Sequence, residues 1–373
     1  MKIVVAMDSF KDCCTALVAS EAVVQGIQEI CPHVDLVIRP MADGGEGTAA
    51  VLQTAMGGQW IDCKVQGPLA PARVDARYLW LESTGTAVVE MAQASGLHCL
   101  SESQRNPMRT SSYGTGQLIQ AALDQGAERI LLAVGGSATV DLGIGMASAL
   151  GWSFLDEHRK PVEAVGQSLL KIEQINRPAY TLEAEVRVLC DVSNPLLGQE
   201  GAAKVYAPQK GASRSDVVLL EVGLTHIANL IRRQFNVEID GIPGGGAAGG
   251  LSAGAVVFLG ATLVRGVEAI MHETGLLHEL QDADFVVTGE GRFDAQSFFG
   301  KVINGIAQAC DKTATKVVVL AGQVHLNQEQ YGLKGVDQAI SCTPPDMSLP
   351  VALKQGPQLL YQSAKRWAQE TLV

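Results

Sequence analysis

Short apolar runs alternate with segments of helical periodicity at both ends of this 373-residue chain, and this alternation restricts the fold more than any other feature. Residues 2–7 read KIVVAM, and residues 15–31 then place apolar side chains at mostly three- to four-residue spacing, as an amphipathic helix does. A second strand-like run (34–41) and a second helical run (48–58) follow. Because strands that alternate with helices pair in parallel, the sequence predicts an α/β fold.

The middle of the chain differs from its two ends. From Trp60 to Met91, strand-like runs follow one another without helices between them, whereas the C-terminal part returns to the alternation seen at the start. We therefore expect two α/β domains. Residues 1–80 and 275–373 would form a discontinuous Rossmann-like or flavodoxin-like domain with a parallel sheet, and residues 81–274 an inserted α/β domain of a different type. Two sequential domains are the alternative.

Five of the expected strands end in the same way, in a loop of glycine, Asp or Glu, and small polar residues. The five loops carry Asp8 and Ser9; Asp43, Gly44, Gly45 and Glu46; Gly135, Gly136, Ser137 and Thr139; Asp191 and Asn194; and Glu290, Arg292, Asp294 and Lys301. Ligands of open α/β sheets bind outside the carboxyl ends of strands, where loops converge and helix N-termini present free N–H groups. The sequence thus predicts that these loops build one site.

The charges of these loops indicate what the site binds. Carboxylates on at least four strand ends would repel one another unless a metal ion or a cationic group gathered them, and Lys11, Arg292 and Lys301 supply positive charge, with Lys210 as a further candidate. Carboxylates, backbone N–H groups and a few cations suit a phosphate bound with Mg²⁺, which prefers oxygen ligands. Phosphoryl transfer also needs one carboxylate to accept a hydroxyl proton.

Composition argues against several other classes of protein. A net charge of -11 without any Lys/Arg-rich run disfavours nucleic-acid binding. The eight cysteines lack the spacing of a zinc site or a disulfide framework, and reduced thiols in the cytoplasm are expected. The first apolar run is short and the charge-free stretch 241–264 is rich in glycine, so we expect neither a signal peptide nor membrane binding. A homodimer is compatible with the sequence, which leaves the oligomeric state open.

Common nucleotide and nucleophile motifs are weak or missing. GxxxxGK[ST], GxSxG and HExxH do not occur. GxGxxG occurs once, at Gly244, Gly246 and Gly249, where a glycine-rich chain matches it easily. A nicotinamide-dependent oxidoreductase of a small hydroxy acid therefore remains an alternative.

A set of longer motifs carries a resemblance. The chain contains, in this order, DSFK, ADGGEGT, RNP, GTG, GGSAT, CDVSNPLLGQEGA, APQKGA, GAAGG and TGEGRFDAQSFFGK. Over nearly its whole length it resembles the glycerate kinase family. The resemblance implies ATP- and Mg²⁺-dependent transfer of the γ-phosphoryl group to D-glycerate, usually at the 2-hydroxyl to give 2-phosphoglycerate, in organic-acid catabolism. It also implies an active site in the cleft between two α/β domains.

The resemblance and the charges together suggest roles for the loop residues. Lys11, Arg292 and Lys301 would contact substrate carboxylate or phosphate, and Gly135, Gly136, Ser137 and Thr139 would donate to phosphate oxygens. Asp8, Asp43, Asp191, Glu290 and Asp294 compete for the roles of Mg²⁺ ligand and general base. We favour Asp191 as the base, with Asp294 and Glu290 near the metal.

The chain departs from the family's motifs in three places. Met7 precedes DSFK, Val140 and Leu142 stand where Asn and Gly are customary, and Phe298 and Phe299 precede Gly300-Lys301. These changes bear on substrate preference and rate more than on the fold. The altered GGSATVDLG loop keeps a second alternative open, a non-catalytic protein that binds a small anion.

Overall fold

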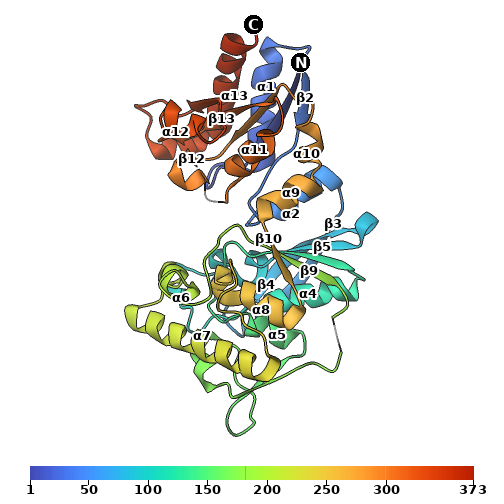
Figure 1. Ribbon diagram of the computed structural model, residues 1–373, viewed down its shortest axis with the longest axis vertical. Helices are drawn as coiled ribbons and strands as arrows, with labels where there is room; N and C mark the ends of the chain where they lie inside the picture. Colours follow the sequence, from blue (N-terminus) through green and yellow to red (C-terminus); the bar gives the residue numbers. More distant parts are fainter. Residues whose placement is uncertain (181, 299) are drawn as a thin grey trace. The chain divides into compact units, whose positions relative to one another are not determined.

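The protein divides into two compact units, as seen in a computed structural model (Figure 1). The structure describes residues 1–180, 182–298 and 300–373. The first unit comprises Met1–Asp43, Ala50–Gly57 and Arg265–Val373, and the second comprises Gly44–Ala49 and Gly58–Val264. Each unit holds a sheet with parallel strands and helices packed against it, so the predicted α/β fold is confirmed.

The first unit contains a five-stranded sheet in which every pairing is parallel. Its strands, in spatial order, are β15 (Gln338–Ser341), β13 (Lys316–Ala321), β11 (Phe285–Gly289), β1 (Lys2–Met7) and β2 (Asp35–Ile38). Counted along the chain and read from β2, this is the order 2-1-3-4-5 of flavodoxin-like sheets. The order reverses between β1 and β11, and ligands of such sheets bind at the carboxyl ends of the strands beside the reversal.

Helices cover both faces of this sheet (Figure 1). They are α1 (Ala16–Ile30), α2 (Thr48–Met56), α9 (Gly266–Glu273), α10 (Leu276–Glu279), α11 (Val302–Cys310), α12 (Gln328–Gly332) and α13 (Leu349–Thr371). Alternate side chains of a strand point to opposite faces. Ile3, Val5 and Met7 of β1 therefore pack with α1 and α13, whereas Val4 and Ala6 pack with α9 and α11. Because both faces are buried, β1 reads as a continuous apolar run. A separate short ladder joins β12 (Arg292–Phe293) to β14 (Gln323–Val324).

The second unit contains a mixed six-stranded sheet. Its strands, in spatial order, are β10 (Thr262–Val264), β9 (Glu185–Leu189), β6 (Arg129–Ala133), β5 (Thr86–Glu90), β4 (Arg73–Leu81) and β3 (Gln59–Gln66). β5, β6, β9 and β10 pair in parallel, and the β3–β4 hairpin is added antiparallel to β5. The remaining elements are α3 (Ala92–Ser95), α4 (Tyr113–Asp124), α5 (Ile144–Ala149), α6 (Ala202–Tyr206), α7 (Arg214–Phe235), α8 (Leu251–Leu259) and the hairpin β7 (Ser153–Leu155) with β8 (Gln174–Asn176).

The division between the units differs from the boundaries expected from the sequence. We assigned residues 58–80 to the first domain, but β3 and nearly all of β4 belong to the sheet of the second unit. Residues 265–274, which we assigned to the insert, lie in the first unit, where Val267 and Ile270 join its core. A period-two pattern shows that a strand forms but does not show which sheet it joins.

Several local sequence features have a clear role in the helices. The apolar stripe of the long helix α7, formed by Leu220, Leu224, Ile227 and Ile231, is fully buried at 0% exposure. Ser213 and Asp216 form a capping box at the start of that helix, which satisfies N–H groups of its first turn. Pro350 lies in the first turn of α13, where its missing N–H costs no hydrogen bond.

The charge-free stretch 241–264 folds as a glycine-rich loop followed by the short helix α8. Most residues of α8 are buried inside the second unit, including Leu251, Phe258 and Leu259. Within the described part of the chain, every helix is too short or too polar to cross a membrane.

Candidate active site

Carboxylates gather at the carboxyl edge of the first unit's sheet, beside the reversal of strand order. Asp8 directly follows β1, and Glu290 directly follows the neighbouring strand β11. The Asp8 N–H donates to the Gly289 carbonyl at 2.9 Å, which continues the ladder and holds the two acidic residues side by side. Asp43 comes from the loop after β2, on the other side of β1, and its charge acts on Asp8. Three of the five predicted loops therefore meet here.

The electrostatics of this cluster, Asp8, Asp43 and Glu290, favour a bound cation or proton. Burial raises the pKa of Asp8 well above its ordinary value, and the negative charges of Asp43 and Glu290 raise it further. The Ser9 N–H, which donates to Asp8 Oδ1 at 2.6 Å, and the charge of Lys301 oppose this rise without cancelling it. Negative charge at Asp8 is therefore only partly compensated by the protein itself.

An ion pair joins Glu290 of this cluster to Lys301 at the start of a helix. Lys301 precedes α11 as its N-cap, and its Nζ lies 3.1 Å from Glu290 Oε2. The other carboxylate oxygen of Glu290, Oε1, is buried and accepts no hydrogen bond from the described residues. A buried oxygen without a hydrogen-bond partner lowers the stability of the folded state unless a ligand contacts it.

These residues fit Mg²⁺ as partial ligands. Mg²⁺ binds through one or two carboxylates and takes its remaining oxygens from water and substrate phosphates. Among the described residues, no group of three or more His, Cys, Asp or Glu side chains is arranged as a complete metal site. The buried Glu290 Oε1 and the Asp8 carboxylate match the smaller protein share that Mg²⁺ requires.

Arg292 and Asp294 form a closed pair within their own loop. The Arg292 Nε and Nη2 atoms lie 2.7 and 2.6 Å from Asp294 Oδ2, and the Gln296 N–H donates to Asp294 Oδ1 at 2.8 Å. Desolvation acts to raise the pKa of Asp294, but the Gln296 hydrogen bond and Arg292 outweigh it, and the pKa is lowered. Asp294 is thus a stably ionised group that orients Arg292, and it is a weak proton acceptor.

The remaining predicted residues of the first unit are more exposed. Ser9 and Lys11 both lie exposed in the loop after β1. Of the departures from the family's motifs, Met7 is fully buried at the end of β1, and Phe298 packs edge-on against Phe293 at a ring distance of 5.5 Å. Phe299 lies outside the described residues. Met7 and Phe298 therefore change packing of the core of this unit.

The second unit brings together the loops that follow β6 and precede α2. The backbone of Gly135 approaches Gly45 so closely that a Cβ at Gly135 would lie 2.6 Å from the Gly45 Cα. A Cβ at Gly136 would overlap the Glu46 carboxylate. Gly135 is thus required by contact with the backbone of the Gly44–Glu46 loop, whereas Gly136 is favoured by its φ of 69°. Glu90, at the end of β5, fastens this loop by accepting the Ala49 N–H at 2.8 Å, and its burial raises its pKa.

Buried polar groups support the loop after β6 from beneath. Lys210 is 2% exposed, and its Nζ donates to Ser137 Oγ at 2.7 Å and to the Thr139 carbonyl at 2.8 Å. Asp141 is fully buried and accepts the N–H and the hydroxyl of Ser112, both at 2.8 Å. Thr139 is also fully buried, and its Oγ1 accepts or donates no hydrogen bond among the described residues. Ser137, at 7% exposure, is held at the edge of this network.

Val140 and Leu142, the departures in this loop, face the interior. Both have 0% exposure and belong to the core formed with α7. Leu142 has φ 54°, a left-handed conformation that favours glycine. The sequence change therefore alters packing and strain below the loop, and it leaves the side chains that could meet a ligand unchanged.

In the loop after β9, the side chain of Asn194 makes two hydrogen bonds. Asn194 Nδ2 donates to the Glu200 carbonyl at 2.8 Å, and its Oδ1 accepts the Tyr206 hydroxyl at 2.7 Å. Its side chain therefore shapes this loop and α6. Asp191 follows β9 and is half-buried, on the same edge of the sheet as Gly135, because β6 and β9 are parallel neighbours.

The single GxGxxG match serves packing between loops. A Cβ at Gly246 would overlap the Pro195 carbonyl, and one at Gly249 would overlap the Thr139 carbonyl. The space that a pyrophosphate would need at these glycines is occupied by the loops after β6 and β9. The motif thus gives no support to a nicotinamide-dependent oxidoreductase.

The predicted site residues fall into two groups, one in each unit. Asp8, Ser9, Lys11, Asp43, Glu290, Arg292, Asp294 and Lys301 belong to the first unit, and Gly44, Gly45, Glu46, Gly135, Gly136, Ser137, Thr139, Asp191 and Asn194 belong to the second. Sequence reasoning gave no role to Glu90 or to Arg105, whose buried Nε has no hydrogen-bond partner among the described residues. A carboxylate that ends an apolar run, as in VVE, was the available signal for Glu90.

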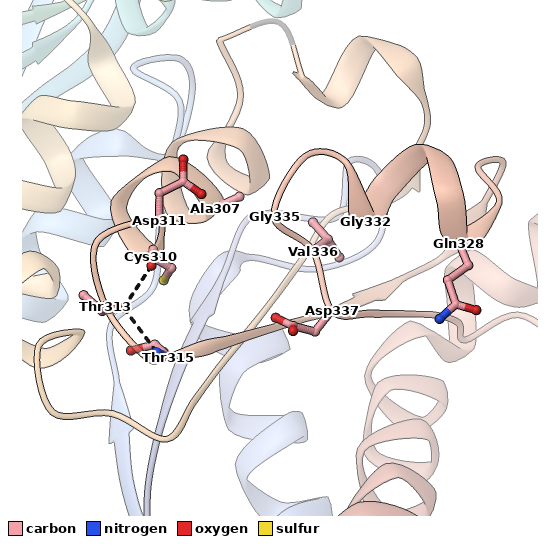
Figure 2. A pocket seen from close by; sticks show the side chains of 10 residues that line it. All are labelled: Ala307, Cys310, Asp311, Thr313, Thr315, Gln328, Gly332, Gly335, Val336 and Asp337. Atoms are coloured by element: carbon pink, nitrogen blue, oxygen red, sulfur yellow. Dashed lines mark hydrogen bonds between the residues drawn. The ribbon is translucent and has the colours of Figure 1, made fainter.

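A hollow of about 460 Å³ lies elsewhere in the first unit (Figure 2). Thr315 and Asp337, which line it, directly precede β13 and β15, and Cys310 ends α11. The hollow is therefore at the amino edge of the sheet, opposite the carboxylate cluster. Its threonines are engaged with neighbouring backbone, as Figure 2 shows for Thr313 and the Cys310 carbonyl at 3.1 Å.

Comparisons with known proteins agree over the whole chain. Residues 3–372 match the family described as the glycerate kinase family. The chain is 44% identical over 369 residues to a glycerate kinase of Halalkalibacterium halodurans, covering 98% of this chain and 97% of the relative. It is 39% identical over 344 residues to a glycerate 2-kinase of Escherichia coli, covering 91% and 90%. A crystal structure of a glycerate kinase 2 from Salmonella typhimurium LT2 superposes with a TM-score of 0.88 at 39% identity, covering 99% of this chain and 98% of that one.

Proposed function

Because the chain belongs to the glycerate kinase family, we propose that it transfers the γ-phosphoryl group of ATP to D-glycerate, with Mg²⁺, to give phosphoglycerate and ADP. The relative described as a glycerate 2-kinase favours the 2-hydroxyl as acceptor and 2-phosphoglycerate as product. The observation that carries the proposal is the cluster of Asp8, Asp43 and Glu290 beside Lys301 at the reversal of strand order. Mixed charges at that place suit a metal-bound phosphate.

The residues of the first unit would bind Mg²⁺ and the phosphate groups. Asp8 and Glu290 would hold Mg²⁺, which supplies neutralisation of the charge that spreads over the phosphoryl oxygens. Lys301, kept near Glu290, would contact a phosphate oxygen, and Arg292 would do so in the orientation set by Asp294. Lys11, exposed in the loop after β1, would add a further contact to phosphate or carboxylate.

The second unit would supply hydrogen-bond donors and the base. Gly135, Gly136 and Ser137 would donate to anionic oxygens, as backbone nests and hydroxyls do. We propose Asp191 as the group that accepts the proton of the attacking hydroxyl, because Asp294 is committed to Arg292 and to the Gln296 N–H. Glu46 and Glu90 would hold the Gly44–Ala49 loop in place.

Location and role follow from the same proposal. All eight cysteines carry free thiols, which fits a reducing compartment, and we propose a cytoplasmic enzyme of organic-acid catabolism. The homodimer stays a proposal that chromatography with light scattering would test.

Phosphorus NMR of a reaction mixture tests the function directly. Purified protein with ATP, Mg²⁺ and D-glycerate should produce ADP and a phosphomonoester whose proton coupling identifies the 2-position. Chelation of Mg²⁺ should stop the reaction, and its return should restore it. Absence of phosphoglycerate from a folded protein would refute the proposal. Phosphate on the 3-hydroxyl would refute only the proposed position.

A further inference from the structure

Lys210 is a buried cation whose hydrogen bonds end on the loop after β6. It ends the short 3₁₀ helix Pro208–Lys210, and its ammonium donates to Ser137 Oγ at 2.7 Å and to the Thr139 carbonyl at 2.8 Å. A buried ammonium is costly and is retained only where such hydrogen bonds compensate it. The buried ammonium of Lys210 thus lies at one of the loops whose small polar residues were expected to bind an anion.

The direction of the Lys210–Ser137 hydrogen bond determines what Ser137 can do. An ammonium group has three donors and no acceptor, so the serine oxygen must be the acceptor. The hydroxyl hydrogen of Ser137 then cannot point to Lys210 and is left to donate to another group. Ser137 keeps 7% exposure and directly follows Gly136, which is exposed, so the residue lies at the open side of the loop.

We propose that Lys210 is a positioning residue, which orients the Ser137 hydroxyl so that its proton is presented to an anionic oxygen of a substrate. This inference rests on the proposed function. Its ligand class is an oxyanion that accepts a hydrogen bond, which is either the carboxylate of D-glycerate or a phosphate of ATP. Lys210 itself acts through Ser137 and the Thr139 carbonyl.

The protonation state of Lys210 adds a readout that a purely structural role would not give. Burial lowers the pKa of Lys210 to about 7, against the opposing charge of Asp141. Charged groups on the neighbouring elements include Arg105, whose backbone packs against Gly211, Lys204 on α6, and Arg214 and Asp216 at the start of α7. Once Lys210 loses its proton, the neutral amine can accept the Ser137 hydroxyl, and the hydrogen bond can reverse. Substrate would then lose the donor, so kcat/KM should fall as the pH rises through about 7.

A double-mutant cycle with pH profiles tests the proposal. We expect Ser137→Ala and Lys210→Met each to lower kcat/KM by about 100-fold, as loss of a positioned donor does. The double variant should be no worse than either single one, because both remove the same donor. The decline of kcat/KM near pH 7 should be absent from all three. A raised KM for D-glycerate alone would identify the carboxylate as ligand, and a raised KM for ATP alone would identify a phosphate.

Controls separate this inference from loss of fold and from failure of the proposed function. Lys160→Met removes an exposed lysine from the same unit, in the loop after β7, and it should keep the kinetics of the unmodified protein. If Lys210→Met fails to fold, the pH profile of Ser137→Ala still tests the inference, because the decline of kcat/KM near pH 7 should be absent from that variant. Independent, multiplicative effects, or a Ser137→Ala variant with normal kinetics, would overturn the inference while the kinase function stands. Absence of turnover in the unmodified protein would overturn both.

Discussion

At the scale of single residues, the buried carboxylates of the candidate site lower the stability of the folded protein. Asp8 is buried beside Asp43 and Glu290, and this arrangement raises its pKa. Burying a carboxylate among others of the same charge destabilises the folded state. Such a loss of stability is typical of a cation-binding site, because binding sites are not optimised for stability.

Asp8→Asn should make the metal-free protein more stable and less active. The pKa of Asp8 is higher in the folded than in the unfolded state, so its ionised form lowers stability above that pKa, and the loss disappears as the pH falls toward 3.8. In EDTA at pH 7 the melting temperature should rise by about 2 °C or more, and turnover with Mg²⁺ should fall by about 100-fold. Asp282→Asn, at the exposed ion pair with Lys2, is the control. A melting temperature lower than that of the unmodified protein would contradict the expected sign.

Leu142 should reverse the usual order of alanine and glycine. Its side chain is fully buried, so truncation to either residue should lower the free energy of unfolding by about 2–5 kcal/mol. At φ 54°, however, alanine keeps the left-handed strain of about 1–2 kcal/mol, and glycine relieves it. Denaturant unfolding should therefore find Leu142→Gly more stable than Leu142→Ala. The opposite order would show that this strain is absent in solution.

At the scale of elements, glycine-rich loops decide how closely other loops can approach. The stretch before α8 holds Ala248, Gly249 and Gly250 in the left-handed region, and this turns the chain against the loop after β6. The glycines of the GxGxxG pattern there allow close packing between loops. The same pattern also occurs in nucleotide-binding loops. Only the position of the Thr139 and Pro195 carbonyls distinguishes the packing role of these glycines from a nucleotide-binding role.

Three glycine-to-alanine substitutions should differ in how far they lower the free energy of unfolding, because they differ in steric contact and in backbone conformation. Gly249→Ala meets both the Thr139 carbonyl and a φ of 68°, Gly260→Ala meets only a φ of 65°, and Gly241→Ala meets neither. The free energy of unfolding should fall by more than about 2 kcal/mol for the first, about 1 kcal/mol for the second and close to zero for the third. Urea unfolding of the three variants gives the order, and similar losses at Gly249 and Gly260 would contradict the proposed contact.

At the scale of the whole molecule, each unit has cores of its own. The cluster around Leu118 and Leu132 and the cluster around Leu224 both lie entirely within the second unit, whereas β1 and the helices around it form the first. A unit with its own hydrophobic core can fold independently. The second unit is nearly continuous in sequence, so it can be produced as a fragment.

The fragment 58–264 should fold cooperatively by itself, because it keeps the complete six-stranded sheet. Near-ultraviolet circular dichroism and a single thermal transition would show this. The fragment 81–274, with the boundaries expected from the sequence, lacks the β3–β4 hairpin and would leave the edge of β5 unpaired. We expect it to aggregate. Equal behaviour of the two fragments would count against the division at residues 57 and 265.

The sequence by itself determined the class of fold and predicted the chemistry of the candidate site. Alternating strands and helices, five strand ends with acidic and glycine-rich loops, and motifs of the glycerate kinase family were all readable, because they are local in the chain. The family was confirmed by the comparisons. The roles of Asp191, Asp294 and the other site residues stay predictions.

Only the tertiary structure decided which neighbours each loop has. It paired Asp8 with Glu290 across 282 residues of chain, committed Asp294 to Arg292 and Asn194 to its own loop, and placed Lys210 beneath Ser137. It also moved residues 58–80 to the second sheet. Periodicity records which side of an element is buried, but strand order, burial of a charge and the direction of a hydrogen bond arise from contacts between distant segments.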